Sequence, residues 1–171
     1  MDLVEMAVDS IRVHMPSGQH VVILKERDTE RYLPIWIGVA EANAIAIKIT
    51  GIQPERPITH DLLVNVFSDL NVQVTRIVVT SLSNDVFFAR IVGRYDGRQM
   101  DLDARPSDAI ALAVRLGSPI YVDREVLDKA AVLPELPSDD EAERLKVFQE
   151  MINSMDLPDL DDPGSSSRRG A

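Results

Sequence analysis

Two short segments of this chain place an arginine and a proline directly before hydroxyl and acidic residues. They are residues 56–61, which read RPITHD, and residues 104–108, which read ARPSD. Both patterns are typical of helix starts, because proline suits the first turn, threonine or serine can cap free N–H groups and aspartate suits the positive helix end. Helix formation does not explain the arginines, since a cation at that end is unfavourable unless an anion neutralises it. The two segments therefore predict a polar site that faces an anionic ligand.

A structural role is the simpler interpretation of most of these polar residues. Capping or dipole interactions would account for Thr59, Asp61, Ser107 and Asp108. Asp103 and Asp101 alternate with apolar residues, which fits the solvent face of a strand. His60 fits the exposed position that a first-turn histidine commonly takes.

Glu41 is a carboxylate in a segment, residues 39–49, that is otherwise rich in alanine and isoleucine. Such a carboxylate either reaches solvent at the first turn of its helix or pairs with a cation. Arg56 and Arg105 are the candidate partners. A pairing would bring one of the two arginine segments against this helix.

Hydrophobic periodicity predicts the elements that position these residues. Alternating or β-branched runs predict strands at residues 4–8, 21–24, 32–37, 72–81, 86–95, 99–104 and 120–122, with a tight turn at Asp96-Gly97. Helical patterns predict helices at residues 39–49, 106–116 and 124–132, and across an apolar stripe of Leu62, Leu63, Val66, Phe67 and Leu70. The element order predicts an α+β domain with a mixed, mainly antiparallel sheet and packed, largely buried helices.

Burial can be predicted for several of these elements. Residues 39–49 and 106–116 are apolar on nearly every side, so we expect both helices to be buried. Trp36, the single tryptophan, is expected in the core. Some apolar strand residues are expected on a sheet face without full cover, namely Phe87, Phe88 and Ile91. Such a surface favours a homo-oligomer, with a dimer as its simplest form.

Length and composition limit the class of protein. With 171 residues and 45% apolar content, the chain can form one domain with a core, which we expect at residues 1–132. Residues 133–155 are expected to form an acidic linker and helix, and residues 156–171 a disordered tail. The absence of cysteine excludes disulfides, thiolate metal ligands and a cysteine nucleophile. Because no stretch approaches the ~20 apolar residues of a membrane span, we expect a cytoplasmic protein without membrane contact.

The net charge of −10 lies mainly in the C-terminal part. Residues 1–122 hold 12 basic and 15 acidic side chains, a net of −3, and residues 123–171 hold 6 and 13, a net of −7. The sequence therefore shows no strongly basic region for sequence-independent nucleic-acid binding. It also lacks a Walker loop, a dinucleotide-binding fingerprint, a nucleophile elbow and a paired-histidine metalloprotease helix, so those enzyme classes lose support.

Three segments, in this order along the chain, resemble the bifunctional nuclease domain family. They read YLPIWIG at residues 32–38, followed by Glu41-Ala42, then RPITHDL at 56–62 and DARPSDAIAL at 103–112. The resemblance covers roughly residues 3–132. It implies a compact α+β domain with a mixed sheet, found in bacteria and in plants, whose members degrade both DNA and RNA.

Together with the resemblance, the polar residues indicate a nuclease mechanism. Phosphodiester hydrolysis needs an activated water and neutralisation of charge at phosphorus, which carboxylate-bound Mg²⁺ or Mn²⁺ and arginine can supply. His60 would act as general base or acid. Catalysis is assigned to Glu41, His60, Asp61 and Asp108, phosphate binding to Arg56, Arg105 and Ser107, and metal binding to Asp103 and Asp108. The expected partner is nucleic acid, bound weakly and with strong salt sensitivity because the domain is not basic.

Two other functions fit the same residues. In a non-catalytic regulatory or interaction domain, the arginines would tie the helices to the sheet and the site would bind a small anionic ligand or a protein partner. A hydrolase of small phosphoesters would avoid the problem of the acidic charge. An open pocket lined by Glu41, Arg56, His60, Arg105 and Asp108 would favour chemistry, whereas closed pairing of these residues would favour the structural role.

Overall fold

The computed structural model describes residues 2–14 and 17–133. The chain divides into two units after Pro134, and the fold is that of the first. Beyond Leu133, the linker and helix predicted for residues 133–155 and the tail predicted for residues 156–171 lie outside the described residues. The predicted domain boundary near residue 132 stays a prediction.

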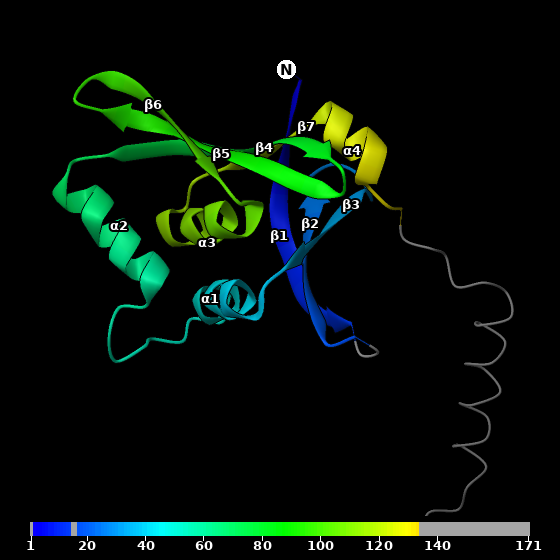
Figure 1. Ribbon diagram of the computed structural model, residues 1–171, viewed down its shortest axis with the longest axis horizontal. Helices are drawn as coiled ribbons and strands as arrows, with labels where there is room; N and C mark the ends of the chain where they lie inside the picture. Colours follow the sequence, from blue (N-terminus) through cyan, green and yellow to red (C-terminus); the bar gives the residue numbers. More distant parts are fainter. Residues whose placement is uncertain (1, 15–16, 134–171) are drawn as a thin grey trace, which may run out of the picture. The chain divides into compact units, whose positions relative to one another are not determined.

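Seven strands form one mixed sheet with the strand order β3-β2-β1-β7-β4-β5-β6 (Figure 1). The strands are β1 (Leu3–His14), β2 (Gln19–Glu26), β3 (Tyr32–Ile37), β4 (Gln73–Ser83), β5 (Val86–Tyr95), β6 (Arg98–Ala104) and β7 (Ile120–Asp123). All neighbouring strands are antiparallel except β4 and β7, which run parallel. The predicted turn between β5 and β6 is present, with positive φ angles of 48° at Asp96 and 72° at Gly97. The sheet confirms the predicted α+β class.

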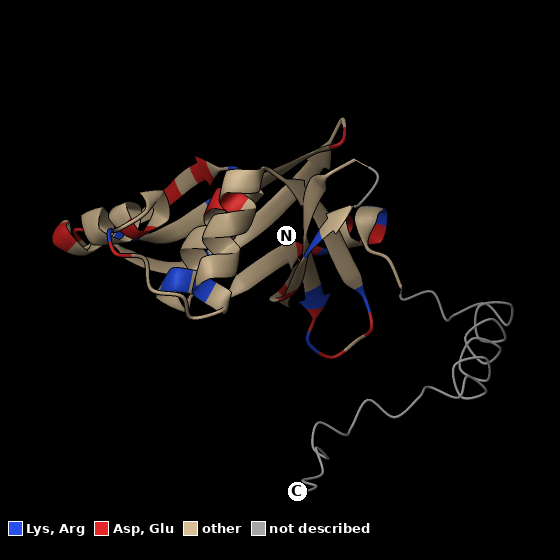
Figure 2. Cartoon of the chain, turned by 90° about the horizontal axis from the view of Figure 1, so that it is seen from below, with Lys and Arg blue, Asp and Glu red and all other residues tan. Residues whose placement is uncertain are grey.

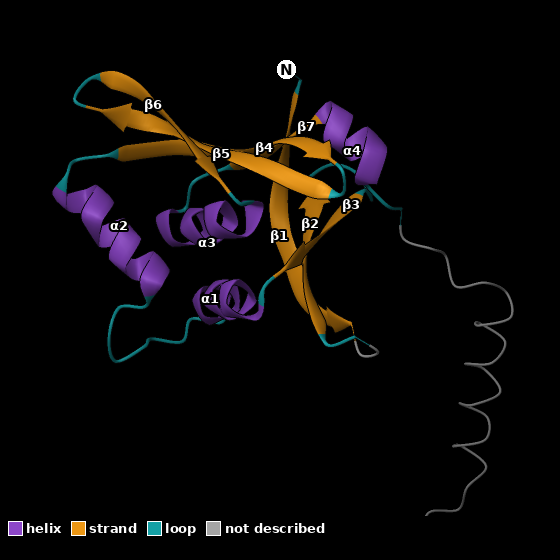
Figure 3. Ribbon diagram, viewed as in Figure 1, coloured by secondary structure: helices purple, strands orange, loops and turns teal. Residues whose placement is uncertain are grey.

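In the described part of the chain, four helices accompany the sheet, and Figure 3 shows their arrangement around it. They are α1 (Val39–Ile49), α2 (Thr59–Asp69), α3 (Pro106–Leu116) and α4 (Arg124–Ala130). α3 packs against β4 and β5, and both α1 and α2 pack against α3, while α4 contacts β3, β4 and β7. α3 therefore contacts the sheet on one side and both α1 and α2 on the other.

The core is centred on α3. Five consecutive residues of this helix, 109–113, are at most 1% exposed. They pack with apolar residues of the sheet, including Val22, Leu24, Ile77 and Val79. Three alanines among the five residues keep the helix narrow enough to contact elements on both sides. The predicted burial of residues 106–116 is confirmed except at the C-terminal end, where Leu116 is exposed.

The predicted burial of Trp36 was wrong, because its side chain is 54% exposed. Successive residues of a strand point to opposite faces of the sheet. In β3, Leu33 and Ile35 point into the core, so Trp36 points away from it. Its ring packs edge-on against the ring of His14, with the centroids 5.8 Å apart.

α1 is less buried than its composition predicts. Ala42, Ala44 and Ile45 are buried, but Val39 and Ile49 are more than half exposed. α1 packs against α3 and β2, so its other side faces solvent. An apolar composition on all sides of a helix therefore did not mean burial on all sides.

The apolar stripe predicted on α2 is divided between two faces. Leu63 and Phe67 pack against the core, whereas Leu62, Val66 and Leu70 are exposed. Residues four apart lie in one line along a helix, and α2 packs against one neighbouring helix, α3. Only one of its two apolar lines is therefore covered.

The predicted apolar sheet surface is also smaller than expected. Ile91 is 5% exposed and belongs to the core, and Phe87 packs against the core. Phe88 is exposed, as predicted. Ile91 faces the helices because it shares a strand face with the buried Ala89. The homodimer stays a prediction.

Candidate active site

Three helices begin in the same way. In α1, α2 and α3, the residue before the first turn has an extended backbone and an acidic residue follows three positions later. These acidic residues are Glu41, Asp61 and Asp108. In none of the three helices does the N-cap residue itself provide a side-chain cap, and the predicted capping by Thr59 and Ser107 was wrong, since both lie inside a first turn. Asp61 does cap α2, because its Oδ2 accepts from the Ile58 backbone N–H. The carboxylates stand near three positive helix ends, as predicted for Asp61 and Asp108.

Arg105 joins the starts of α1 and α3. Its Nη2 donates to Glu41 Oε1 at 2.6 Å and to Asp108 Oδ1 at 3.1 Å, and its Nε donates to Asp108 Oδ2 at 2.7 Å. Pairing of Glu41 with Arg105, one of the predicted alternatives, is confirmed. The Arg105 side chain is 66% exposed, and its Nη1 donates to none of the described residues. Arg105 therefore keeps a free donor that faces solvent.

Gly38 allows this pairing. A Cβ at Gly38 would overlap the Glu41 carboxylate, which folds back over the start of α1. The backbone of Gly38 has φ −71°, an angle that any residue adopts, so the close approach of the carboxylate is what requires glycine here.

His60 and Asp108 form a partly buried pair. His60 is 8% exposed, and its Nε2 lies 3.1 Å from Asp108 Oδ1. An ionised carboxylate only accepts hydrogen bonds, so Nε2 carries the proton. In the neutral ring, Nδ1 is then the basic nitrogen, and it is bonded to none of the described residues. Asp108 thus orients the His60 ring, and Nδ1 is left free to accept a proton.

The contacts stabilise the charged forms of Asp108 and Arg105. Burial alone would raise the pKa of Asp108, but hydrogen bonds from Arg105 and His60 outweigh burial and hold its pKa below the usual range. Hydrogen bonds to Asp108 and then to Glu41 raise the pKa of Arg105. The guanidinium and the Asp108 carboxylate are therefore ionised at neutral pH.

These side chains line one pocket of about 350 Å³. Most of its polar lining comes from Glu41 and Asn43 of α1, His60 of α2, Asp108 of α3 and Arg105, which directly precedes α3. Thr59 and four apolar residues complete its lining, the latter being Ala40, Ala44, Ile47 and Ile58. The volume lies in the range of small-ligand sites. The structure therefore brings together four of the predicted site residues from three separate segments of the chain.

Asp61 and Arg56 line a different pocket. Asp61 Oδ1 accepts from Arg115 Nε at 2.7 Å, and Asp61 Oδ2 accepts from the Ile58 backbone N–H at 3.0 Å. Burial would raise the pKa of Asp61, but these two hydrogen bonds outweigh it and lower the pKa. With both oxygens engaged, Asp61 is a structural partner of Arg115 and stands apart from the His60 pocket.

Asp103 lies on β6 and contacts a cation of the neighbouring strand. Its carboxylate is 3.7 Å from Arg90 Nη1, and that of Asp101 is 2.8 Å from Arg90 Nε. Asp103 is 75% exposed, which agrees with the solvent face of an alternating strand. Asp103 and Asp108 were expected to share a metal ion, but they have no common partner.

The donors as arranged do not fit a divalent metal. Within residues 2–14 and 17–133, no three His, Asp or Glu side chains gather closely enough to hold a metal ion. Arg105 Nη2 contacts both Glu41 and Asp108 and so takes the position that a cation would need between them. Mg²⁺ requires oxygen ligands on all sides, and here the space between the two carboxylates is taken by the Arg105 guanidinium. The requirement for Mg²⁺ or Mn²⁺ stays a prediction.

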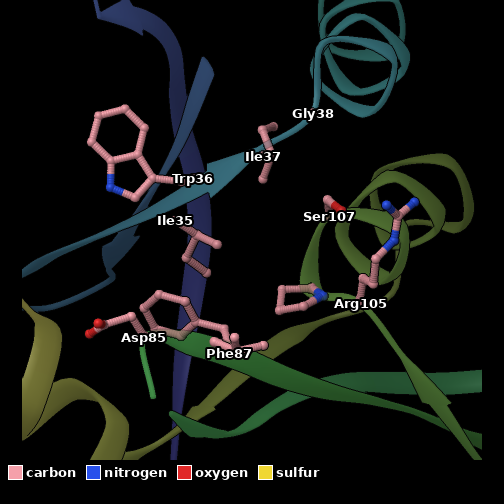
Figure 4. A pocket seen from close by; sticks show the side chains of 10 residues that line it. Ile35, Trp36, Ile37, Gly38, Asp85, Phe87, Arg105 and Ser107 are labelled. Carbon is pink, nitrogen blue, oxygen red and sulfur yellow. The ribbon is translucent and has the colours of Figure 1, made fainter. Parts of the chain in front are cut away.

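Arg105 also lines a second pocket, of about 360 Å³. Figure 4 shows Arg105 and Ser107 along one side of it, with the Trp36 ring pointing away from both. Ser107 is 5% exposed, and its hydroxyl bonds to none of the described residues. Phe87 contributes an aromatic wall. Arg105 therefore lines two pockets and is accessible from both.

Sequence reasoning missed Arg115, which positions Asp61 in the separate pocket that Asp61 shares with Arg56. The Arg115 side chain is 5% exposed and fixes Asp61. A basic residue in the last turn of a helix normally interacts with the helix dipole, so its position gave no sign of an ion pair with another helix. By contrast, the role of Gly38 could have been inferred from the sequence, because a glycine between a predicted strand and a predicted helix lies three residues before Glu41.

Comparison with known proteins identifies the family. The bifunctional nuclease domain matches residues 22–135 of this chain. The chain belongs to the bifunctional nuclease domain family. An uncharacterized protein of Mycobacterium tuberculosis is 38% identical over 162 residues, which cover 91% of this chain and 97% of that relative. The predicted resemblance is confirmed.

Two plant relatives of this bifunctional nuclease domain are more distant. Bifunctional nuclease 1 of Oryza sativa subsp. japonica is 24% identical over 120 residues, and bifunctional nuclease 2 of Arabidopsis thaliana is 26% identical over 131 residues. The matches cover 68% and 70% of this chain. The chain spans 36% and 40% of the length of these relatives.

The surface of this bifunctional nuclease domain carries mixed charge. Figure 2 shows basic and acidic positions interspersed along the described elements.

In the described part of the chain, no helix is long and apolar enough to cross a membrane.

Proposed function

We propose that this chain hydrolyses phosphodiester bonds of single-stranded DNA and RNA in the pocket of His60, Asp108 and Arg105. The observation that carries the proposal is the 3.1 Å contact between His60 Nε2 and Asp108 Oδ1 beside an arginine with a free donor. Membership of the bifunctional nuclease domain family supports it, as do two plant relatives named bifunctional nucleases.

His60 is the general base of the proposed reaction. Its Nδ1 accepts a proton from the water that attacks phosphorus, while Asp108 holds Nε2 and stabilises the imidazolium that forms. The P–O bond to the leaving oxygen breaks as the new P–O bond forms. The leaving oxygen takes up a proton from solvent or from the imidazolium.

Arg105 binds the phosphate in this proposal. Glu41 and Asp108 hold its Nε and Nη2, which fixes the plane of the guanidinium and leaves Nη1 for a phosphate oxygen. The positive ends of α1 and α3 add partial charge at the same place. Ser107 offers a further donor in the second pocket that Arg105 lines.

Binding of nucleic acid at this pocket is weak in the proposed mechanism. Two carboxylates flank one guanidinium, so the formal charge of the cluster is negative while His60 is neutral. Residues 1–122 also carry a net charge of −3, with 12 basic and 15 acidic side chains. Affinity should therefore be low, and it should fall further as salt rises.

The test compares two histidine variants on end-labelled single-stranded DNA and RNA. His60→Ala should lower the cleavage rate by roughly 10²-fold or more, because it removes a general base. His14→Ala is the matched control, since His14 is exposed and contacts the Ser17 hydroxyl at 2.9 Å. Circular dichroism checks that both variants fold. Equal cleavage by the two variants would reject the site and indicate a contaminating nuclease.

A non-catalytic domain that binds a small anion is the second candidate. The observation that favours it is mutual pairing, because Arg105 contacts Glu41 and Asp108, and Asp108 contacts His60. In this case Arg105→Ala would destabilise the fold by about 1–3 kcal/mol, as expected for broken polar contacts, and the purified protein would cut neither nucleic acid nor a small phosphoester.

A further inference from the structure

A third pocket, of about 260 Å³, lies at the C-terminal end of α1 and gathers basic side chains. Lys48 of α1, Arg56 of the following loop and Arg115 of α3 all line it. Asp61 is its one acidic lining residue. In a domain with more acidic than basic residues, this is a local excess of positive charge.

The Asp61 carboxylate leaves most of this charge uncompensated. Both of its oxygens are engaged, one by Arg115 Nε and one by the Ile58 backbone N–H. Lys48 and Arg56 form no ion pair with any described residue. The formal charge of the four side chains is therefore +2.

Arg115 provides a rigid donor at the base of the pocket. Its side chain is 5% exposed, with Nε bonded to Asp61 and Nη1 bonded to the Ala111 carbonyl at 2.9 Å. Nη2 donates to none of the described residues. A guanidinium fixed on one side, with a free nitrogen and two flexible cations nearby, suits a phosphate group.

We infer that this pocket binds a second phosphate of the same nucleic-acid strand, a few nucleotides from the phosphate at Arg105. This assignment to a strand rests on the proposed function, whereas the binding of phosphate does not. Ile47 lines both this pocket and the His60 pocket, and adjacent residues of α2, His60 and Asp61, face one pocket each. The two sites therefore lie next to each other along α1.

The separation of the sites predicts the length of strand that reaches both. Glu41 and Lys48 are seven positions apart on α1, which corresponds to about 10 Å along the helix axis. A stacked strand advances about 3.4 Å per nucleotide. A strand of several nucleotides can therefore reach both sites, whereas a dinucleotide, with one phosphodiester, reaches only one.

The experiment measures binding of fluorescein-labelled hexathymidylate and a labelled thymidine dinucleotide in a His60→Ala background, which keeps the strand intact. The double variant Lys48→Gln/Arg56→Gln is compared with Arg94→Gln/Arg98→Gln, which removes two exposed cations from the β5–β6 hairpin. We expect the first to weaken hexamer binding roughly tenfold and to reduce the salt slope by about 0.7–1.4. Dinucleotide binding should not change, and the hairpin variant should bind the hexamer nearly as the parent does.

Equal effects of the two double variants on the hexamer would overturn the inference. A second measurement separates a strand from a free ligand, namely the rise in melting temperature caused by inorganic phosphate. If Lys48→Gln/Arg56→Gln abolishes that rise and leaves hexamer binding intact, the pocket takes a free phosphate compound and the assignment to a strand is overturned. Because binding is measured without turnover, failure of the nuclease proposal leaves this test intact.

Discussion

His60 Nε2 lies 3.1 Å from Asp108 Oδ1, although 48 positions separate the two residues in the sequence. Each residue is in the first turn of its own helix, so this contact joins the start of α2 to the start of α3. Asp108 is also bound by Arg105, which reaches Glu41 on α1. One carboxylate therefore connects three helix starts, and its removal should affect both stability and any chemistry at the pocket.

The pKa of Asp108 predicts the pH dependence of this stabilisation. The folded-state pKa lies below the ordinary value of 3.8, so the unfolded chain takes up the proton first as pH falls. The contribution of Asp108 is therefore complete above that ordinary value and is lost as pH falls through the folded value. Urea unfolding should show Asp108→Asn to be less stable than the parent by about 1–3 kcal/mol near neutral pH, with the difference shrinking below about pH 4.

Asp103→Asn is the control for this measurement, because Asp103 is 75% exposed and lies 3.7 Å from its nearest cation. Its effect should stay within about 0.5 kcal/mol at every pH. A stability difference for Asp108→Asn that is constant from neutral to strongly acidic pH would contradict the assigned ion pairs.

Gly38→Ala should destabilise the protein through Glu41. A Cβ at this position overlaps the Glu41 carboxylate, whose atoms are the three nearest to it, so the substitution should push Glu41 away from Arg105. The expected cost is about 1–2 kcal/mol in urea unfolding. In a Glu41→Ala background the same Gly38→Ala change should cost almost nothing, since the clashing carboxylate is gone. If Gly38→Ala lowers the free energy of unfolding equally in the two backgrounds, the clash with Glu41 is not its cause.

The predicted metal requirement can be tested separately from the histidine. If Mg²⁺ or Mn²⁺ is required, a chelator should abolish cleavage of single-stranded RNA and added metal should restore it. The metal would have to displace Arg105 from Glu41 and Asp108, so Arg105→Ala should then tighten metal binding in calorimetry. Full activity in the presence of chelator would refute the metal prediction and leave the reaction to His60, Asp108 and Arg105.

The sequence predicted the elements better than their exposure. Alternation and helical periodicity place most strands and helices within a few residues, because both patterns are local. The exception is β1, which was predicted at residues 4–8 and spans Leu3–His14. The exposure of Trp36 and Ile91 depends on which face of a strand the helices cover, and that is set by the tertiary arrangement. The predicted faces were wrong for both residues for this reason.

The candidate site was predicted in part. Arg105 stands out in the sequence because helix formation does not explain an arginine at a helix start. Asp108 and His60 were assigned to the site because they lie in the same two Arg-Pro segments. The partner of Asp61 could not be predicted, since Arg115 lies 54 positions away on another helix. Asp61 and Arg56 were therefore assigned to the same site as His60, whereas the structure gives them a separate pocket.

A double-mutant cycle on cleavage rate tests most directly whether His60 and Asp108 act as one catalytic unit. Cleavage of a labelled single-stranded oligonucleotide is measured for His60→Ala, Asp108→Asn and the double variant under identical conditions. If Asp108 acts by orienting His60, the double variant should be no slower than His60→Ala alone, because residues that act as a unit are non-additive. Multiplicative losses in the double variant, or unchanged rates in both single variants, would contradict the proposed mechanism.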